Sequence, residues 1–242
     1  MMQYINLAAY KFIRLQPEKL VLLQSQLKQK TLEYGIKGTI LLSPEGINLF
    51  LAGAFNAMKS LQEFLNTLPE IANLQYKTSE SSHIPFKRMI VRIKKEIITM
   101  KTDGIQPESY TAPYIEPAQL KDWFDSNKPM VLLDTRNDFE FNMGSFVNAI
   151  HLDIKSFSDF PEATSSLPTS AKNQTVVTFC TGGIRCEKAA AYLLKQGFTD
   201  VWQLRDGILG YFEQCGGEYF QGNCFVFDNR IALDSQLREA EM

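Results

Sequence analysis

A short apolar strand that runs directly into a cysteine and two glycines constrains the fold of this chain more than any other feature. Residues 176–179 are β-branched and aromatic, which is typical of a buried strand. Residues 180–185 follow at once, and the alanine- and leucine-rich residues 188–194 are strong helix formers. Such a strand–loop–helix unit indicates a mostly parallel α/β sheet, whose functional loops lie beyond the carboxyl ends of the strands.

The loop between this strand and this helix is suited to an anionic sulfur atom. It consists of Cys180, Thr181, Gly182, Gly183, Ile184 and Arg185. The glycines let the backbone turn sharply, so that N–H groups point inward at the positive end of the helix. A free cysteine is only about 3% thiolate at neutral pH, and a pKa lowered by ~2 units makes the thiolate the main form. We therefore predict that Cys180 reacts as a thiolate or carries a persulfide.

The spacing of Cys180 and Arg185 separates two classes of cysteine loop. Cysteine-dependent phosphatases place one more residue between nucleophile and arginine, in order to surround a tetrahedral phosphate. The tighter loop found here fits a single sulfur atom and resembles the active-site loop of the rhodanese (sulfurtransferase) superfamily. The competing interpretation is a buried, inert cysteine before a Gly-Gly turn.

The remaining cysteines and the histidines predict no metal site. Cys186 follows the loop, and two roles stay open for it: resolving an oxidised or persulfidated Cys180 as a disulfide, or packing beneath the loop. The four cysteines lack paired metal-ligand spacing, and the only two histidines, His83 and His151, lie far apart in the sequence. His151 is expected to pack near the sheet.

A charged segment after another buried strand predicts a local ion pair. Residues 130–134 form that strand, and Arg136 is expected to pair with Glu140 one turn onward. This contact would mainly stabilise the fold.

The first hundred residues predict a ferredoxin-like α+β domain. Apolar periodicity and turn residues give the order β-α-β-β-α-β. The expected strands are residues 5–12, 39–42, 47–51 and 73–78, and the expected helices are residues 17–34 and 54–68. Residues 43–46 read as a hairpin turn, and residues 89–98 as a further edge strand.

The remainder of the chain predicts an α/β domain between a linker and a tail. Residues 99–118 contain three prolines and little periodicity, which is typical of a linker. Residues 119–220 alternate strands and helices and form the predicted catalytic domain. Residues 221–242 are the predicted carboxyl-terminal tail, in which residues 224–227 resemble a strand.

The charge of the chain is divided unevenly between these parts. The net charge is only −2, but residues 1–100 hold 13 lysines and arginines against 7 acidic residues, whereas the rest holds 12 against 20. The candidate nucleic-acid-binding residues are Lys87, Arg88, Arg92, Lys94 and Lys95. Lysines on an edge strand also prevent edge-to-edge association, and the sequence leaves both roles open.

The sequence favours a cytoplasmic protein. No apolar run reaches the length of a membrane span, and the first residues lack the basic flank and apolar core of a signal peptide. Four cysteines without a disulfide pattern are consistent with a reducing compartment.

Several segments together resemble one family, the bacterial rhodanese-domain tRNA uridine 5-hydroxylases, which modify the wobble uridine. The matching segments occur in the same order as in that family and extend over nearly the whole chain. They are residues 37–48, 95–98, 133–140, 180–189, 207–209 and 224–228.

This resemblance implies an oxygen-dependent conversion of the wobble uridine in the tRNA anticodon loop to 5-hydroxyuridine. It also implies an acylphosphatase-like (ferredoxin-like) domain ahead of a rhodanese-like domain, with Cys180 as the essential residue. O2 would be the co-substrate, and no metal or organic cofactor is evident from the residues. Many members continue into a cysteine-containing carboxyl extension, whose role, including metal binding, stays open for this chain. The electron donor, the set of tRNAs and the oligomeric state are likewise open.

Two other classes of function use the same loop. A thiosulfate or persulfide sulfurtransferase would need Cys180 but neither tRNA nor O2. A non-catalytic rhodanese-like module that binds RNA or protein is disfavoured, because such modules often lack the cysteine that this chain retains.

Overall fold

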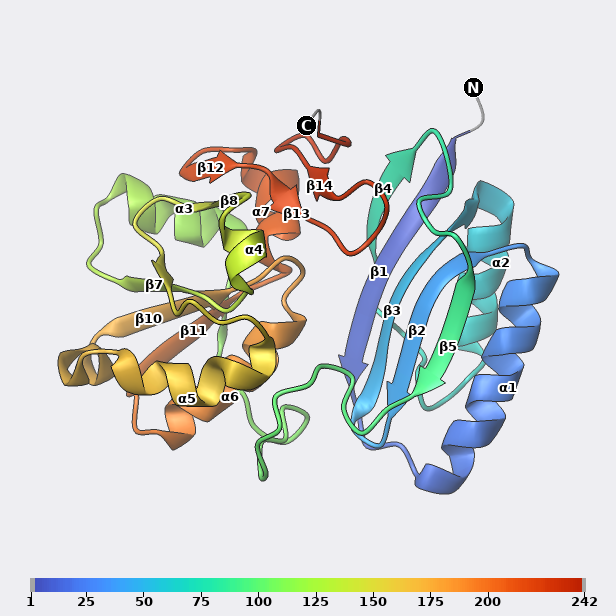
Figure 1. The fold of residues 1–242 in the computed structure, drawn as a ribbon, viewed down its shortest axis with the longest axis horizontal. Coiled ribbons are helices and arrows are strands. Elements are labelled where there is room, and N and C mark those ends of the chain that lie inside the picture. The colour runs from blue at the N-terminus through green and yellow to red at the C-terminus, as the bar shows by residue number, and fades with distance from the viewer. Residues whose placement is uncertain (1–2, 241–242) are drawn as a thin grey trace. The chain divides into compact units, whose positions relative to one another are not determined.

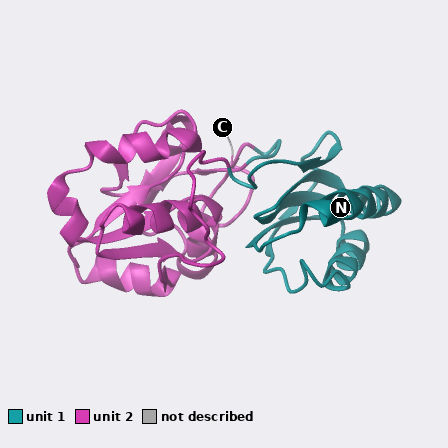
Figure 2. Cartoon of the chain, turned by 90° about the horizontal axis from the view of Figure 1, so that it is seen from below, with its two compact units in different colours: residues 1–98, 227–230 teal, residues 99–226, 231–242 magenta. Residues whose placement is uncertain are grey.

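The chain folds into two compact units, which Figure 2 colours separately. The structure is a computed structural model, and it describes residues 3–240. The first unit comprises the residues up to Ile98 together with Phe227–Arg230. The second comprises Thr99–Val226 and the residues from Ile231 onward.

The first unit is a five-stranded sheet with two helices on one face (Figure 1). Its elements are β1 (Tyr4–Phe12), α1 (Pro17–Glu33), β2 (Lys37–Ser43), β3 (Gly46–Ala54), α2 (Phe55–Asn66), β4 (Lys77–Ser81) and β5 (Met89–Ile93). The strand order is β4-β1-β3-β2-β5; the first four strands pair antiparallel, and β5 joins β2 in parallel. The predicted ferredoxin-like order is confirmed.

Apolar side chains between this sheet and its helices form the core of the first unit. Leu27 of α1, Leu61 of α2 and Leu49 of β3 are fully buried. The core follows the predicted periodicities, with buried positions at helical spacing in α1 and α2 and the buried apolar residues Leu7 and Ala9 two positions apart on β1.

Two strands of the first unit differ from the prediction. The last strand of the split motif is β4 rather than residues 73–78, because Asn73 has a left-handed φ of 59° and the pairing with β1 begins only at Lys77. The edge strand β5 ends at Ile93 rather than at residue 98. Beyond it, side chains replace strand pairing: Ile97 N–H donates to Glu45 Oε1 (2.7 Å), and Asn48 donates to the Ile97 carbonyl (3.3 Å).

The second unit is built on a wholly parallel five-stranded sheet with helices on both faces (Figure 1). The strand order is β6-β11-β10-β7-β9, so β10 is central. The strands of this sheet are β6 (Tyr114–Ile115), β7 (Val131–Asp134), β9 (Ile150–His151), β10 (Thr175–Phe179) and β11 (Asp200–Leu204). The helices are α3 (Pro117–Asp125), α4 (Asp138–Phe141), α5 (Phe160–Ala163), α6 (Ile184–Lys195) and α7 (Gly207–Cys215). The predicted mostly parallel sheet is confirmed.

Smaller elements complete the second unit. Three 3₁₀ turns span Phe157–Asp159, Thr164–Ser166 and Thr169–Asn173. Two short antiparallel pairs join β8 (Gly144–Phe146) to β12 (Phe220–Gly222) and β13 (Cys224–Phe225) to β14 (Ala232–Leu233). Among residues 3–240, no helix is long and apolar enough to cross a bilayer.

The structure divides the predicted linker and tail differently from the sequence analysis. Residues 99–118 belong to the second unit and contain β6, which is too short to show strand periodicity but pairs with β11. The predicted tail is interrupted, since Phe227–Arg230 belongs to the first unit while the flanking residues belong to the second. Within the first unit, Arg230 donates to Ser79 Oγ (2.8 Å), a contact between residues far apart in the sequence.

Candidate active site

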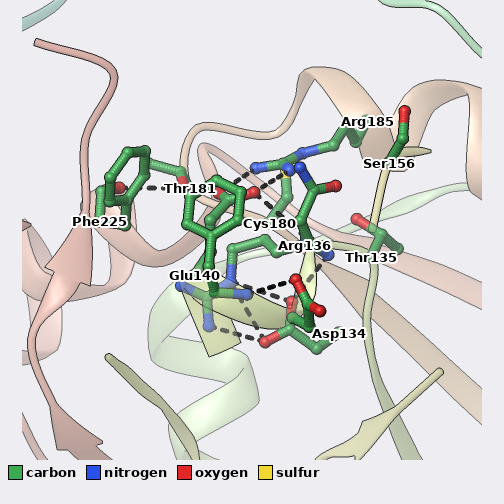
Figure 3. A network of polar contacts seen from close by, with 12 residues as sticks. Asp134, Thr135, Arg136, Glu140, Ser156, Cys180, Thr181, Arg185 and Phe225 are labelled. Carbon is green, nitrogen blue, oxygen red and sulfur yellow. Dashed lines mark hydrogen bonds and ion pairs between the residues drawn. The ribbon is translucent and has the colours of Figure 1, made fainter. Parts of the chain in front are cut away.

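Cys180 directly follows the central strand β10, which ends at Phe179, and α6 begins at Ile184. Figure 3 shows Cys180 among its polar neighbours. Its side chain is fully buried. Of the six loop residues, only Gly182 is not buried, and a Cβ added to it would meet no atom within 4 Å. The loop therefore encloses the sulfur, and Gly182 is the one loop residue that is partly exposed.

Backbone and side-chain donors surround the Cys180 sulfur. The Gly183 N–H donates to Cys180 Sγ at 3.1 Å. Burial raises the pKa of Cys180, but a hydrogen bond from Cys186, the positive charge of Arg185 and the N–H groups of Arg185 and Gly183 together lower this pKa to about 5. A pKa of about 5 makes the thiolate the main form of an unmodified Cys180 at neutral pH.

Cys186 is the protonated partner of this thiolate. It is fully buried, and its Sγ lies 3.9 Å from Thr135 Oγ1. Burial and the contact with Cys180 raise the pKa of Cys186 well above that of a free thiol. The pair thus combines one ionised and one protonated sulfur, and both predicted roles of Cys186 fit this arrangement.

A buried ion pair holds the arginine of the loop. Arg185 Nη1 lies 2.6 Å from Glu140 Oε2, and Nη2 lies 2.7 Å from Oε1 (Figure 3). Glu140 also accepts from the backbone N–H of Asn137 (3.1 Å), which ties α4 to the loop. Glu140 is therefore a site residue that the sequence analysis missed.

The expected pairing of Arg136 with Glu140 is wrong. Arg136 instead turns back to Asp134, with Nη2 at 2.7 Å from Oδ2, and donates to the Gly144 carbonyl (2.6 Å). Its own N–H also donates to Asp134 Oδ1 (3.0 Å), so the short Asp134–Arg136 turn favours this pair. Glu140 is left to meet Arg185, which is 45 positions away in the sequence.

The amino terminus of α7 supports the loop from outside. The N–H groups of Ile208 and Leu209 donate to the carbonyls of Cys180 (2.9 Å) and Thr181 (3.1 Å). Because the peptide is planar and trans, turning these carbonyls toward α7 turns the following N–H groups to the opposite side of the chain. Gly207 makes this close approach with a φ of 63°, and a Cβ there would lie 2.3 Å from the Cys180 carbonyl oxygen.

A second segment contacts the loop through Thr181. The Thr181 hydroxyl lies 3.3 Å from the Phe225 carbonyl oxygen and 3.5 Å from Glu140 Oε1. The neighbouring Cys224 is fully buried, and burial raises its pKa to about 12. Cys224 therefore stays a protonated packing residue.

The remaining predicted residues lie outside this cluster of contacts. His151 packs at β9, where its ring stacks on Phe141 with centroids 4.4 Å apart. The five candidate nucleic-acid-binding residues are in the first unit, whereas Cys180 is in the second. All five are exposed, on or beside the edge strand β5, and none forms an ion pair within the described residues.

Comparisons with known proteins agree with both halves of the fold. Residues 4–97 match the UPF0176 acylphosphatase like domain, and residues 116–214 match the rhodanese-like domain. A protein of Cupriavidus taiwanensis is 48% identical over 99% of this chain and 86% of its own length. One from Burkholderia cenocepacia is 45% identical over 99% of this chain and 87% of its own length. Both are named tRNA uridine(34) hydroxylase, and at this identity and coverage the chain belongs to the tRNA uridine(34) hydroxylase family.

Proposed function

We propose that this protein hydroxylates C5 of uridine 34, the wobble position of tRNA, with O2, and that Cys180 is the residue on which the reaction depends. Near full-length similarity to tRNA uridine(34) hydroxylases supports the substrate and the reaction. The observation that carries the role of Cys180 is its lowered pKa among the N–H groups of Gly183 and Arg185, which we call the N–H cradle. Anticodon-loop bases are unpaired, so one of them enters a protein site at little cost.

The reaction needs two electrons in addition to O2. Converting the C5–H bond to C5–OH with one O2 consumes two electrons and two protons and releases one water. Oxidation of two thiols to a disulfide supplies that number of electrons and protons. In this proposal Cys186 closes a disulfide with Cys180, and an external thiol reduces the pair after each turnover.

Two forms of Cys180 are compatible with the chemistry. A thiolate that adds to C6 of the uracil makes C5 carbanion-like, and therefore reactive toward O2. A persulfide places a second sulfur atom beyond Sγ. The resting enzyme would then carry one additional sulfur atom. Because Sγ is fully buried, the thiolate route requires the loop to open at Gly182 before C6 reaches it.

The basic residues of the first unit provide the second part of the proposal. Lys87, Arg88, Arg92, Lys94 and Lys95 would hold the phosphate backbone of the tRNA. Phosphate contacts position a nucleic acid and carry no base specificity. Selection of uridine 34 then falls to the rhodanese-like unit.

Mass spectrometry of tRNA nucleosides tests this function. A strain without the gene should lose 5-hydroxyuridine, wild-type protein should restore it, and Cys180→Ala should not. Full 5-hydroxyuridine with Cys180→Ser would disprove the role of the sulfur, and no restoration by wild type would disprove the function. The intact mass of purified protein decides between the thiolate and the persulfide.

A sulfurtransferase is the second candidate, because the lowered pKa of Cys180 also suits a thiolate that accepts sulfur. Such an enzyme turns over thiosulfate and cyanide without tRNA or O2. Comparable rates with and without tRNA, and no hydroxylated uridine, would favour this second function.

A further inference from the structure

We propose that Phe139 and Phe225 form a stacking platform for the pyrimidine base that enters the Cys180 site. This inference rests on the proposed function and assigns the subsite for its base. Phe139 lies on α4 and Phe225 on β13, 86 positions later in the chain. Only the fold brings them together.

Phe139 is held beside the reactive loop by its neighbour. The side chain of Glu140 is fully buried and binds Arg185 through both carboxylate oxygens. Phe139, one position earlier, leaves 43% of its surface exposed. Thus α4 anchors the Glu140 side chain inside the site and exposes the preceding side chain, Phe139.

Phe225 is held to the same loop by its backbone. Its carbonyl oxygen lies 3.3 Å from the Thr181 hydroxyl (Figure 3). The rings of Phe139 and Phe225 meet edge to face, with centroids 5.0 Å apart and an interplanar angle of 87°. This contact is a favourable aromatic geometry and supports the exposed ring of Phe139 from one side.

An exposed aromatic ring at this place fits an unstacked base. A base that leaves the anticodon loop loses stacking on its neighbours, and an aromatic side chain replaces that contact. Stacking of a base on an aromatic ring contributes about 1–3 kcal/mol. The backbone of Phe225 meets the loop at Thr181, and the next residue, Gly182, is the one loop residue that is not buried. A base on the platform would therefore approach the loop from this side.

A binding cycle with two RNAs tests the platform. The RNAs are anticodon stem-loops that carry either uridine or an abasic nucleotide at position 34. Wild-type protein should bind the abasic RNA about tenfold more weakly, which corresponds to about 1.4 kcal/mol. Phe139→Ala should bind both RNAs equally, whereas Phe139→Tyr, which keeps the ring, should behave as wild type.

Three controls make the result decisive. Phe55→Ala removes a phenylalanine that is 63% exposed in the first unit, and it should keep the tenfold difference. Phe139→Leu keeps an apolar side chain without a ring and replaces the alanine variant if that variant does not fold. Ultraviolet titration of the Cys180 thiolate should be unchanged in Phe139→Ala, since the groups that lower the pKa of Cys180, namely Cys186, Arg185 and the N–H of Gly183, all remain.

The outcomes separate the platform from the function itself. A tenfold difference that persists in Phe139→Ala, or a shifted thiolate titration in that variant, would overturn the platform. So would wild-type protein that binds both RNAs equally. If wild-type protein forms no 5-hydroxyuridine with tRNA, O2 and a thiol reductant, the proposed function fails instead.

Discussion

Glu140 and Arg185 form a buried two-point ion pair, with N–O distances of 2.6 and 2.7 Å, beside the reactive cysteine. Arg185 is the only loop residue with a formal positive charge, and its field helps to ionise Cys180. A buried guanidinium is costly unless a carboxylate compensates it. Glu140 therefore keeps Arg185 in the loop without neutralising the cradle of N–H groups.

Removing the carboxylate should destabilise the protein strongly. We expect Glu140→Ala to lower the free energy of unfolding by about 3–5 kcal/mol, because it leaves an uncompensated buried charge. Glu140→Gln retains one acceptor oxygen and should destabilise the protein less. Urea unfolding measures both values.

An exposed ion pair supplies the control for this prediction. Glu116 pairs with Arg205 at the surface of the second unit, with exposed fractions of 52% and 43%. Glu116→Ala should cost less than about 1 kcal/mol. Equal destabilisation at Glu116 and Glu140 would show that burial of the Glu140–Arg185 pair is not important.

The stability of the protein should depend on the ionisation of Cys180. Its pKa is about 5 in the folded state and about 8.5 in an unfolded chain, so the unfolded state binds more protons between these values. Stability from Cys180 therefore rises with pH across this window and is lost as the pH falls through 5. The raised pKa of Cys186 acts in the opposite direction, and only above the range of a free thiol.

Urea unfolding of wild type and Cys180→Ser between pH 5 and 8.5 checks this sign. As the pH rises, the unfolding free energy of wild type should increase relative to that of Cys180→Ser, by at most about 1.4 kcal/mol per pH unit. Ultraviolet titration should show a thiolate that is absent from Cys180→Ser. If this difference does not change with pH and the Cys180 thiolate titrates near pH 8.5, the N–H cradle does not lower the pKa of Cys180.

Gly207 should matter to the loop although it lies outside it. Gly207→Ala places a Cβ 2.3 Å from the Cys180 carbonyl oxygen at a left-handed φ, which should cost at least about 1–2 kcal/mol. We expect the displaced loop to raise the pKa of Cys180 and to reduce formation of 5-hydroxyuridine.

Gly182→Ala is the matched substitution within the loop. Its Cβ meets no atom within 4 Å, so the stability and the Cys180 titration should stay close to wild type. A decrease in the activity of this variant would then indicate that the added methyl group obstructs access to the loop at Gly182. Normal titration in Gly207→Ala would argue against support of the loop by α7.

The basic residues beside β5 should determine the salt dependence of tRNA binding. Each of Arg92→Glu and Lys94→Glu should weaken binding and reduce the slope of log affinity against log salt by about 1 for each phosphate group that is no longer neutralised. Lys59 is an exposed lysine on α2, and Lys59→Glu should change the affinity and the salt slope less. If the salt slope is unchanged in both variants, Arg92 and Lys94 do not bind phosphate. Their role would then be to prevent association at the edge of the sheet.

The amino-acid sequence by itself determined the elements whose signals are local. Alternation and helical spacing of apolar residues predicted the ferredoxin-like order. The strand before Cys180 and the helix after it predicted a parallel sheet, with the sulfur at the end of a strand. The two glycines and Arg185 predicted an anion-holding loop. The predictions of the fold succeed because periodicity, turn residues and adjacency along the chain act over a few residues, whereas the anion-holding role of the loop stays a prediction.

Only the tertiary structure decided the partners of that loop. Glu140 reaches Arg185 across 45 positions, α7 reaches the Cys180 carbonyl, and Phe225 meets both Thr181 and Phe139. The sequence placed Glu140 with Arg136 because that pair is one turn apart, yet the Asp134 carboxylate competes for Arg136. Which buried charge meets which is decided by the path of the backbone, since a desolvated ion must find its counter-ion wherever the fold brings one.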